Sequence, residues 1–203
     1  MKLKSTIIIA LVFLTISSYA QEMKTLFIEY KSKTNTYGGY GGPLMNSIHM
    51  NGEWGMVMGG KGGVIINHKI AFGGVGMGLV SNTTFVENGP EVNTNEILNL
   101  DFGAGGIFVE YFFMLDSPVR FSIPLNIMTG GVSINDVNTY TEKESSYVFI
   151  LEPGINMEFN VANQFIPAIN ISYRQAIGSS LVNISNKDLS GFSIGLIFKF
   201  GDF

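Results

Sequence analysis

The sequence predicts an all-β protein, an eight-stranded antiparallel up-and-down transmembrane β-barrel. Segments of about ten residues alternate large apolar with small or polar side chains, which is the period of a strand with two different faces. Charged residues make up only 14% of the chain, against a usual value of about 25%. After the N-terminal run, no segment is long and apolar enough for a spanning helix, and a closed barrel is the other structure that can cross a bilayer.

The N-terminus predicts export. Lys2 and Lys4 precede an apolar run from Ile7 to Leu14, and Ser18-Tyr19-Ala20 forms a small-x-small cleavage site. We therefore expect residues 1–20 to be a signal peptide. A retained anchor is the alternative, but the run is far short of the roughly 20 apolar residues that a spanning helix needs. Residues 21–36 are expected to form a periplasmic N-terminal segment and 37–203 the barrel domain.

Charge and cysteine content exclude several classes of function. Two of the 12 basic residues lie in 1–20, so the mature chain carries 10 basic and 16 acidic residues and a net charge near −6. This balance does not favour nucleic acid as a partner. The chain has no Cys, which excludes disulfides, thiolate chemistry and lipid attachment at the cleavage site.

Eight segments have roughly the length of a tilted bilayer crossing, about 9 to 11 residues. In chain order they are 39–50, 53–66, 70–80, 98–112, 119–131, 146–161, 165–176 and 191–200. The first is the least regular, and the hairpin signal Asn51-Gly52 after it supports it. Asn67 to Lys69 joins the second to the third, Asp116 to Pro118 precedes the fifth, and Ala162 to Gln164 joins the sixth to the seventh. The eighth alternates most cleanly, with a large apolar residue at every even position.

The connections alternate in length. Those at 67–69, 113–118 and 162–164 are short, whereas 81–97, 131–145 and 177–188 are long and polar. Short turns are typical of the periplasmic end of a membrane barrel and long loops of the extracellular end. The short connection at Asn51-Gly52 is an exception at the extracellular end.

The last four segments predict which face meets lipid. On the sixth, one face carries Tyr147, Phe149, Leu151, Ile155, Met157 and Phe159, and the other carries Glu152, Asn156 and Glu158. The fifth, seventh and eighth repeat this separation, while parts of the second and fourth alternate too poorly to assign. An apolar-in soluble barrel is the alternative. We favour the small and polar face inside, because an eight-stranded interior is just wide enough to be filled by side chains.

Four charged residues on the inward faces predict a structural network in the lumen. A three-residue turn at 162–164 places Glu152 across from Arg174, and Arg120 and Glu158 lie near the periplasmic ends of adjacent strands. Directly opposed side chains have Cβ atoms about 4.5 to 5.5 Å apart. We expect two ion pairs that plug the lumen and perform no chemistry. The alternative is that these side chains merely reach water at the rims.

No catalytic, cofactor-binding or metal-binding residue is predicted. Gly55 and Gly60-Lys61 approach a phosphate-binding loop, but Gly62 replaces its Ser or Thr and no helix follows. Glycines inside strands are instead typical of tight coiling around a narrow lumen. Ser47 and His49 share a strand face near the outer rim, which leaves a lipid-modifying enzyme as a minor alternative, and His68 lies at the opposite rim.

The C-terminus resembles the closing strand of Gram-negative outer membrane barrels, whose assembly machinery reads an aromatic ending. We expect Phe198, Phe200 and Phe203 to carry this assembly signal. Phe203 in register with Phe200 would require Gly201-Asp202 to be a bulge or a tail.

Several further segments share this resemblance, which spans nearly the whole mature chain. They are Gly38-Gly39-Tyr40-Gly41-Gly42-Pro43, Gly59 to His68, Glu152-Pro153-Gly154, Ser172-Tyr173-Arg174 and Phe200-Gly201-Asp202-Phe203. The chain resembles a family of small, mostly uncharacterised outer membrane barrels and is distantly similar in architecture to OmpA and OmpX type barrels. The resemblance implies the fold and the outer membrane location, and it supplies no catalytic or binding residues.

The main functional hypothesis is a non-enzymatic, monomeric barrel that contacts membrane lipid and the barrel assembly machinery. It would support the envelope or make surface contacts through its long loops. Passage of a small or apolar compound across the outer membrane is the alternative.

Overall fold

The structure is a computed structural model, and it describes residues 37–50, 52–81, 83–87, 96–115, 117–136, 142–162, 164–181 and 184–203. The signal peptide predicted for 1–20 and the periplasmic segment predicted for 21–36 lie outside these residues. The described residues form nine strands: β1 (Tyr37–Met50), β2 (Glu53–Ile66), β3 (Ile70–Leu79), β4 (Thr83–Glu87), β5 (Glu96–Phe113), β6 (Val119–Asp136), β7 (Glu142–Phe159), β8 (Phe165–Ile177) and β9 (Gly191–Asp202).

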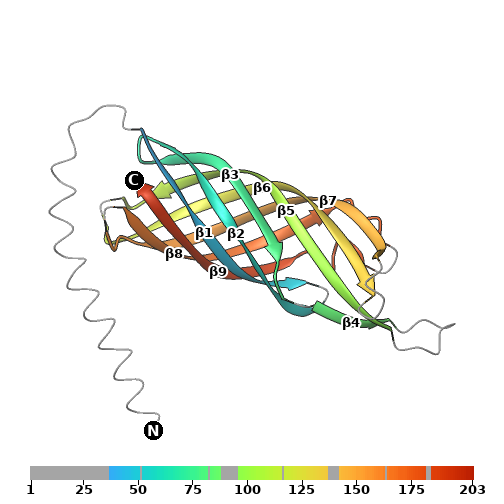
Figure 1. Ribbon diagram of the computed structural model, residues 1–203. Helices are drawn as coiled ribbons and strands as arrows, with labels where there is room; N and C mark the ends of the chain where they lie inside the picture. The colour runs from blue at the N-terminus through green and yellow to red at the C-terminus, as the bar shows by residue number, and fades with distance from the viewer. Residues whose placement is uncertain are drawn as a thin grey trace, which may run out of the picture.

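Eight of these strands close into an antiparallel up-and-down barrel (Figure 1), which confirms the predicted fold class. Consecutive strands pair around the wall, β3 pairs with β5, and β9 pairs with β1 to close the ring. β4 stands outside the ring and pairs with the first residues of β5, at the end of the barrel opposite the C-terminus. We call the end with the short turns periplasmic and the other end extracellular.

Two tight turns have the backbone that their residues favour. Gly52 has φ +81° in the two-residue connection between Met50 and Glu53, which pair with each other. Asn67 and His68 have φ near +53° and +55°, and the N–H of Lys69 donates to the carbonyl of Ile66 at 3.1 Å. Positive φ at both central residues defines the type I′ turn, whose twist matches that of a hairpin.

The alternation predicted for the last four segments is present in the structure. Ile123, Ile155 and Ile171 point outward and are more than half exposed. Their sequence neighbours Ser122, Asn156 and Ser172 point inward and are buried. An apolar exterior around a polar interior is the arrangement of a membrane barrel. Within the described ranges, no helix is long and apolar enough to cross a membrane.

The long connection predicted for 131–145 is wrong in its extent. β6 continues to Asp136 and β7 begins at Glu142, and part of the 81–97 connection forms β4. The alternation is inverted in these extensions: Val132 and Ile134 point inward and are buried, whereas Ser133 and Asn135 point outward. A strand above the membrane exposes polar residues to water, so its sequence has no apolar outer face and reads as a loop.

The bulge or tail predicted at Gly201-Asp202 is also wrong. β9 stays in register with β1 to its end, with Gly201 opposite Tyr40 and Asp202 opposite Gly39. Phe203 therefore follows the inward rather than the outward series. Its ring stacks on Tyr40 with centroids 5.9 Å apart.

The interior carries most of its buried polar side chains in its periplasmic and middle parts. At the extracellular end it is apolar, with Ile48, Val57, Leu100, Val132 and Ile150 among the buried side chains. The glycines in β2 and β3 fit the expectation that glycines inside strands allow tight coiling around a narrow lumen. A Cβ at Gly63 or Gly73 would lie 2.2 or 2.1 Å from a backbone oxygen of the facing strand, so these two strands require glycine to approach each other.

Candidate functional site

Five charged side chains from five strands meet inside the barrel toward its periplasmic end. They are Lys61 of β2, Glu110 of β5, Arg120 of β6, Glu158 of β7 and Lys199 of β9, and we call them the lumen charge cluster. Each occupies an inward position of its strand, and none is more than 6% exposed. Charges this deeply buried require close partners. Removing an ion from water costs on the order of several kcal/mol, even after the surrounding protein has relaxed.

Lys199 is the bridge of the cluster. Its Nζ lies 2.6 Å from Oε1 of Glu110 and 2.5 Å from Oε1 of Glu158. Arg120 Nε lies 2.5 Å from Oε2 of Glu158, and Lys61 Nζ lies 3.3 Å from Oε2 of Glu110. Each carboxylate thus contacts two cations.

Neutral side chains donate further hydrogen bonds to the two carboxylates of the cluster. The Tyr40 hydroxyl donates to Oε2 of Glu110. Ser122 Oγ lies 2.6 Å from Glu110 and 2.8 Å from Glu158, and Asn156 Nδ2 donates to Glu110 at 2.6 Å. Glu110 therefore receives several donors at once, while Nη2 of Arg120 is buried without a hydrogen-bond partner among the described residues.

Aromatic rings complete the packing around the cations. Lys199 Nζ lies 4.7 Å from the Tyr40 ring centroid and 5.0 Å from that of Phe112. Lys61 Nζ lies 4.1 Å from the Phe108 centroid. These cation–π contacts place apolar surface where water would otherwise enter the lumen.

A second ion pair lies nearer the extracellular end. Nε and Nη2 of Arg174 lie 3.0 and 2.9 Å from Oε2 of Glu152, and Ser172 Oγ donates to Oε1 at 3.0 Å. The neighbouring pairs of β7 and β8 set Glu152 opposite Arg174. The guanidinium carbon lies 4.9 Å from the Phe102 ring centroid.

Asn170 joins this pair to the charge cluster. Its Nδ2 donates to Oδ1 of Asn156 at 2.7 Å, and its Oδ1 lies 3.3 Å from Ser172 Oγ. Polar contacts therefore extend from Arg120 near the periplasmic end to Arg174, and the single Ser172 hydroxyl proton can be donated to either Glu152 or Asn170. The two groups form one network across the middle of the lumen.

The structure groups the four charged residues predicted from the sequence as Arg120 with Glu158 and Glu152 with Arg174. Sequence reasoning missed Lys61, Glu110 and Lys199. Lys199 was open to detection, since it occupies an odd position of the cleanly alternating last strand. Glu110 was not, because both faces of 107–112 are otherwise apolar.

The three phenylalanines predicted as an assembly signal do not share a face. Phe198 and Phe200 point outward, and the Phe165 ring stacks on both, with centroids 6.4 and 4.8 Å away. Phe203 points inward, and the guanidinium carbon of Arg120 lies 5.0 Å from its ring centroid.

The histidines form no catalytic arrangement in the part of the chain that the structure describes. Ser47 and His49 both face outward from β1, but no hydrogen bond joins them and no carboxylate contacts either. His49 packs its ring edge against Trp54. His68 lies in the turn at the opposite end of the barrel.

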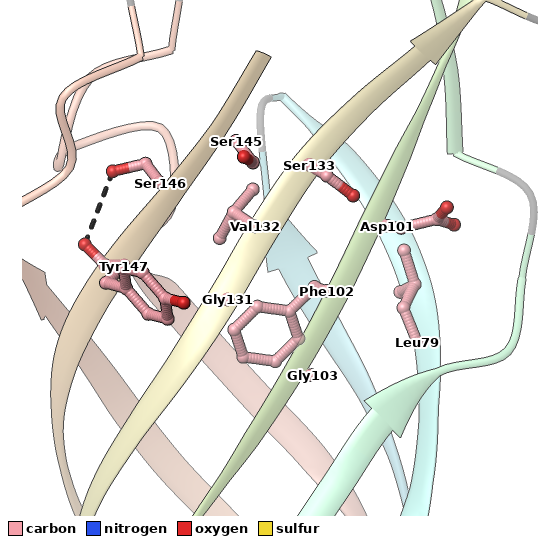
Figure 2. Close-up of a pocket in the computed structure, with 10 residues that line it drawn as sticks. All are labelled: Leu79, Asp101, Phe102, Gly103, Gly131, Val132, Ser133, Ser145, Ser146 and Tyr147. Atoms are coloured by element: carbon pink, nitrogen blue, oxygen red, sulfur yellow. Dashed lines mark hydrogen bonds between the residues drawn. The ribbon is translucent and has the colours of Figure 1, made fainter. Parts of the chain in front are cut away.

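A cavity of about 680 Å³ opens at the extracellular end of the barrel (Figure 2). Its lining combines the inward side chains of Leu79, Phe102, Val132 and Ser146 with residues at outward positions of the same strands, namely Asp101, Gly103, Gly131, Ser133, Ser145 and Tyr147. Phe102 separates it from Arg174 below.

A four-stranded sheet extends beyond this cavity, and we call it the extracellular sheet. It consists of Thr83–Glu87, 96–102, 132–136 and 142–148, beyond the last pairs of β3 with β5 and of β8 with β7. On its outer face, Asp101 accepts hydrogen bonds from Asn99 at 3.3 Å and from Asn135 at 2.5 Å. β4 is the edge of this sheet, since it pairs only with β5 among the described strands.

The chain between β8 and β9 covers the extracellular end of the lumen. Leu181, Ile184 and Leu189 are buried there against the apolar interior. The N–H of Ser180 donates to Ser146 Oγ at 2.9 Å. The stretch 177–188, predicted as a polar loop, contains Leu181 and Ile184, and Leu189 follows it directly.

Comparison with solved structures finds the same fold. The chain is similar to Neisserial surface protein A (NspA), at 11% identity and TM-score 0.54 over 84% of this chain and 99% of that one. It is also similar to the N-terminal β-barrel domain of Pseudomonas aeruginosa OprF, at 9% identity and TM-score 0.53 over 83% and 99%. Ail, the attachment invasion locus protein of Yersinia pestis, solved with the heparin analogue sucrose octasulfate, aligns at 14% identity and TM-score 0.50 over the same shares.

No protein-family model matches the chain, and no curated protein matches it. NspA, Ail and OprF are eight-stranded outer membrane barrels. The shared fold, together with the apolar exterior and the charged interior, identifies this chain as an outer membrane β-barrel protein.

Proposed function

We propose that this chain is a surface-contact protein of the outer membrane, with the extracellular sheet as its contact surface. The observation that carries the proposal is the edge of β4, which pairs with β5 alone among the described strands. Natural proteins usually shorten, charge or cover an exposed strand edge, because its free N–H and C=O groups can pair with another chain. Here the edge lies at the end of the molecule that faces away from the cell.

An edge of this kind suits an extended segment of another protein. Strand addition gains affinity from main-chain hydrogen bonds and selectivity from alternate side chains. The expected partner is therefore an extended peptide segment.

Charge restricts the choice of partner further. The stretch 81–97 contains three glutamates and no Lys or Arg. Sucrose octasulfate, the ligand in the Ail structure, is a polyanion and would be repelled by such a surface. A neutral or basic partner fits this chain better.

Passage through the lumen is disfavoured by the same geometry. The charge cluster fills the interior with buried, mutually bonded side chains, and none of its residues lines the extracellular cavity. A rim enzyme is disfavoured because, within the described ranges, Ser47 and His49 lack an acidic partner. These observations support a non-enzymatic, closed barrel.

Assembly and association belong to the same proposal. Phe198 and Phe200 lie on the lipid face of the closing strand, where the barrel assembly machinery could read them from outside. Phe203 would contribute only if it is read before the lumen closes around it. We infer a monomer in contact with outer membrane lipid.

Intact cells that express the protein provide the test. Wild type should confer aggregation or binding to a surface coated with a basic protein, and Val86→Pro in β4 should remove that gain. Gln164→Ala in a periplasmic turn is the matched control and should behave as wild type. Unchanged binding by Val86→Pro, at equal surface abundance, would contradict a contact through β4.

A further inference from the structure

The cavity at the extracellular end of the barrel opens on the outer face of the wall. The inward side chains that border it are almost closed to solvent, with Val132 1%, Phe102 6% and Ser146 7% exposed. The outward residues that border it are open instead, among them Asp101 and Tyr147. The space of about 680 Å³ therefore lies outside β5, β6 and β7, where a molecule in the membrane can reach it.

Two glycines form the base of this cavity. Gly103 of β5 pairs with Gly131 of β6, and Gly131 pairs on its other side with Tyr147 of β7. In Figure 2 the Tyr147 ring stands beside Gly131. Because neither glycine has a side chain, a ligand can lie directly on the backbone of β5 and β6 with this ring next to it.

The packing of the barrel does not require glycine at these two positions. A Cβ at Gly131 would have no atom within 4 Å, and a Cβ at Gly103 would lie 4.0 Å from the nearest atom, a backbone oxygen. By contrast, a Cβ at Gly130, the inward neighbour of Gly131, would lie 2.4 Å from a backbone oxygen. Close approach of the strands thus explains the inward glycine, whereas an occupant outside the wall explains the outward pair.

The side-chain-free surface continues from the cavity toward the middle of the membrane. Gly78 of β3 lies opposite Gly103, and in the next outward row Gly76 lies opposite Gly105 of β5. A Cβ at Gly76, Gly78 or Gly105 would meet nothing closer than 3.7 Å. We call these three residues, Gly103 and Gly131 the glycine floor. It offers a continuous strip of backbone on which an extended acyl chain can lie.

The cavity lies at the level where the barrel passes from lipid into water. Tyr147 is 89% exposed, and tyrosine is enriched at membrane surfaces, where its ring meets apolar chains and its hydroxyl meets water. Along β7, the next outward residue toward the membrane is Phe149, and the next one away from it is Ser145. A ligand in the cavity therefore needs one apolar and one polar part.

Polar side chains border the cavity on the side away from the membrane. Asp101 of β5 pairs with Ser133 of β6, and Ser133 pairs with Ser145 of β7, so that these three residues form one outward row. Asp101 accepts hydrogen bonds from two asparagine side chains. Among the described residues, no Lys or Arg forms an ion pair with it. Its negative charge is thus available to a cationic group of a ligand.

We propose that the cavity and the glycine floor bind one phospholipid with a primary amine in its head group. The ammonium group donates to the Asp101 carboxylate, and the hydroxyls of Ser133 and Ser145 donate to the lipid phosphate. One acyl chain lies on the glycine floor. A hydrogen bond between two ionised groups is roughly twice as strong as a neutral one, and the same carboxylate repels a lipid whose only charge is its phosphate. The site is separate from the edge of β4 and does not depend on it.

Native mass spectrometry of the refolded protein in detergent micelles tests this proposal. Dimyristoyl phosphatidylethanolamine, phosphatidylcholine and phosphatidylglycerol are added in separate titrations. The three lipids share their acyl chains, but the choline head group has no N–H to donate and the glycerol head group has no amine. We expect one bound phosphatidylethanolamine per chain, at concentrations about tenfold below those that the other two lipids require.

Two variants separate the head-group contact from the acyl-chain contact. Asp101→Asn should bind phosphatidylethanolamine about tenfold more weakly, because the ammonium group loses its charged acceptor. Gly103→Leu combined with Gly131→Leu fills the base of the cavity and should abolish the bound lipid. Asp202→Asn removes an exposed carboxylate on β9, and Gly41→Leu adds a leucine at an outward glycine of β1 whose Cβ would have no atom within 4 Å. Both are matched controls and should bind as wild type.

Migration of unheated samples on gels reports whether each variant is folded. If the double leucine variant does not fold, Gly131→Leu alone should still weaken binding. Equal binding of the three lipids by the wild-type protein would overturn the proposal. Unchanged binding of phosphatidylethanolamine by the folded Asp101→Asn or Gly131→Leu variant would overturn it as well.

Discussion

Lys199 of β9 and Glu110 of β5 meet at 2.6 Å across the lumen. Three strands separate them in either direction around the ring, so this ion pair spans the full width of the barrel. A salt bridge between opposite walls leaves no central path for solute at that level. It also couples two strands that share no backbone hydrogen bond.

Glu110→Gln should destabilise the barrel strongly. The variant leaves Lys61 and Lys199 buried with one carboxylate fewer, and breaking a buried pair by removing one partner costs about 3 to 5 kcal/mol. Urea unfolding in vesicles, followed by Trp54 fluorescence, measures this change in the free energy of unfolding. Asp202→Asn, at an exposed carboxylate on β9, is the control and should leave stability nearly unchanged. A similar stability for both variants would contradict the role assigned to Glu110.

Glu152 and Arg174 should be energetically coupled. Either Glu152→Leu or Arg174→Met alone leaves one uncompensated buried charge, so each should cost roughly 3 to 5 kcal/mol, while the double variant should cost less than either. A double-mutant cycle from the same unfolding experiment measures the coupling. Additive effects of the two substitutions would show that the pair does not stabilise the lumen.

The lipid-facing assignment predicts a depth-dependent cost for charge. Ile169→Arg or Leu196→Arg should lower the free energy of unfolding by roughly 2 to 4 kcal/mol near the bilayer midplane. Ser145→Arg on the extracellular sheet should have little effect, because that side chain already faces water. If all three variants unfold at the same urea concentration as wild type, the outward faces do not contact lipid.

The topology predicts where proteases reach the chain in intact cells. Cleavage should occur in the connection between β4 and β5 or between β6 and β7, and should spare the connection between β5 and β6. Mass spectrometry of the released fragments identifies the sites. Cutting between β5 and β6 from outside, in cells with an intact envelope, would invert the orientation.

The fold could be predicted because a strand in lipid must separate its two faces. Ile169 and Asn170, or Ile194 and Ser193, follow a strict period of two, and short turns fix which strands are neighbours. The positions of Arg120, Glu152, Glu158 and Arg174 followed from the same alternation. In β2 and β5, glycines and apolar residues occupy both faces, so Lys61 and Glu110 could not be assigned to the lumen without the closed ring.

The extracellular sheet could not be predicted from the sequence for a different reason. Asp101, Ser133 and Asn135 occupy outward positions above the membrane, where water replaces lipid and the apolar signal disappears. Gly201 and Asp202 were misjudged because Phe203 was expected to point outward. Packing against Tyr40 inside the barrel is a tertiary contact that periodicity cannot report.

Conductance in a planar lipid bilayer tests most directly the claim that the lumen is closed and that function lies on the surface. Purified protein that migrates as a folded barrel should insert without discrete current steps, because the network from Arg120 to Arg174 blocks the interior. The same conductance measurement on folded Glu110→Gln, which loosens this network, is the comparison for the wild-type protein. Stable, reproducible current steps from the wild-type protein would contradict a closed lumen and favour passage of solute.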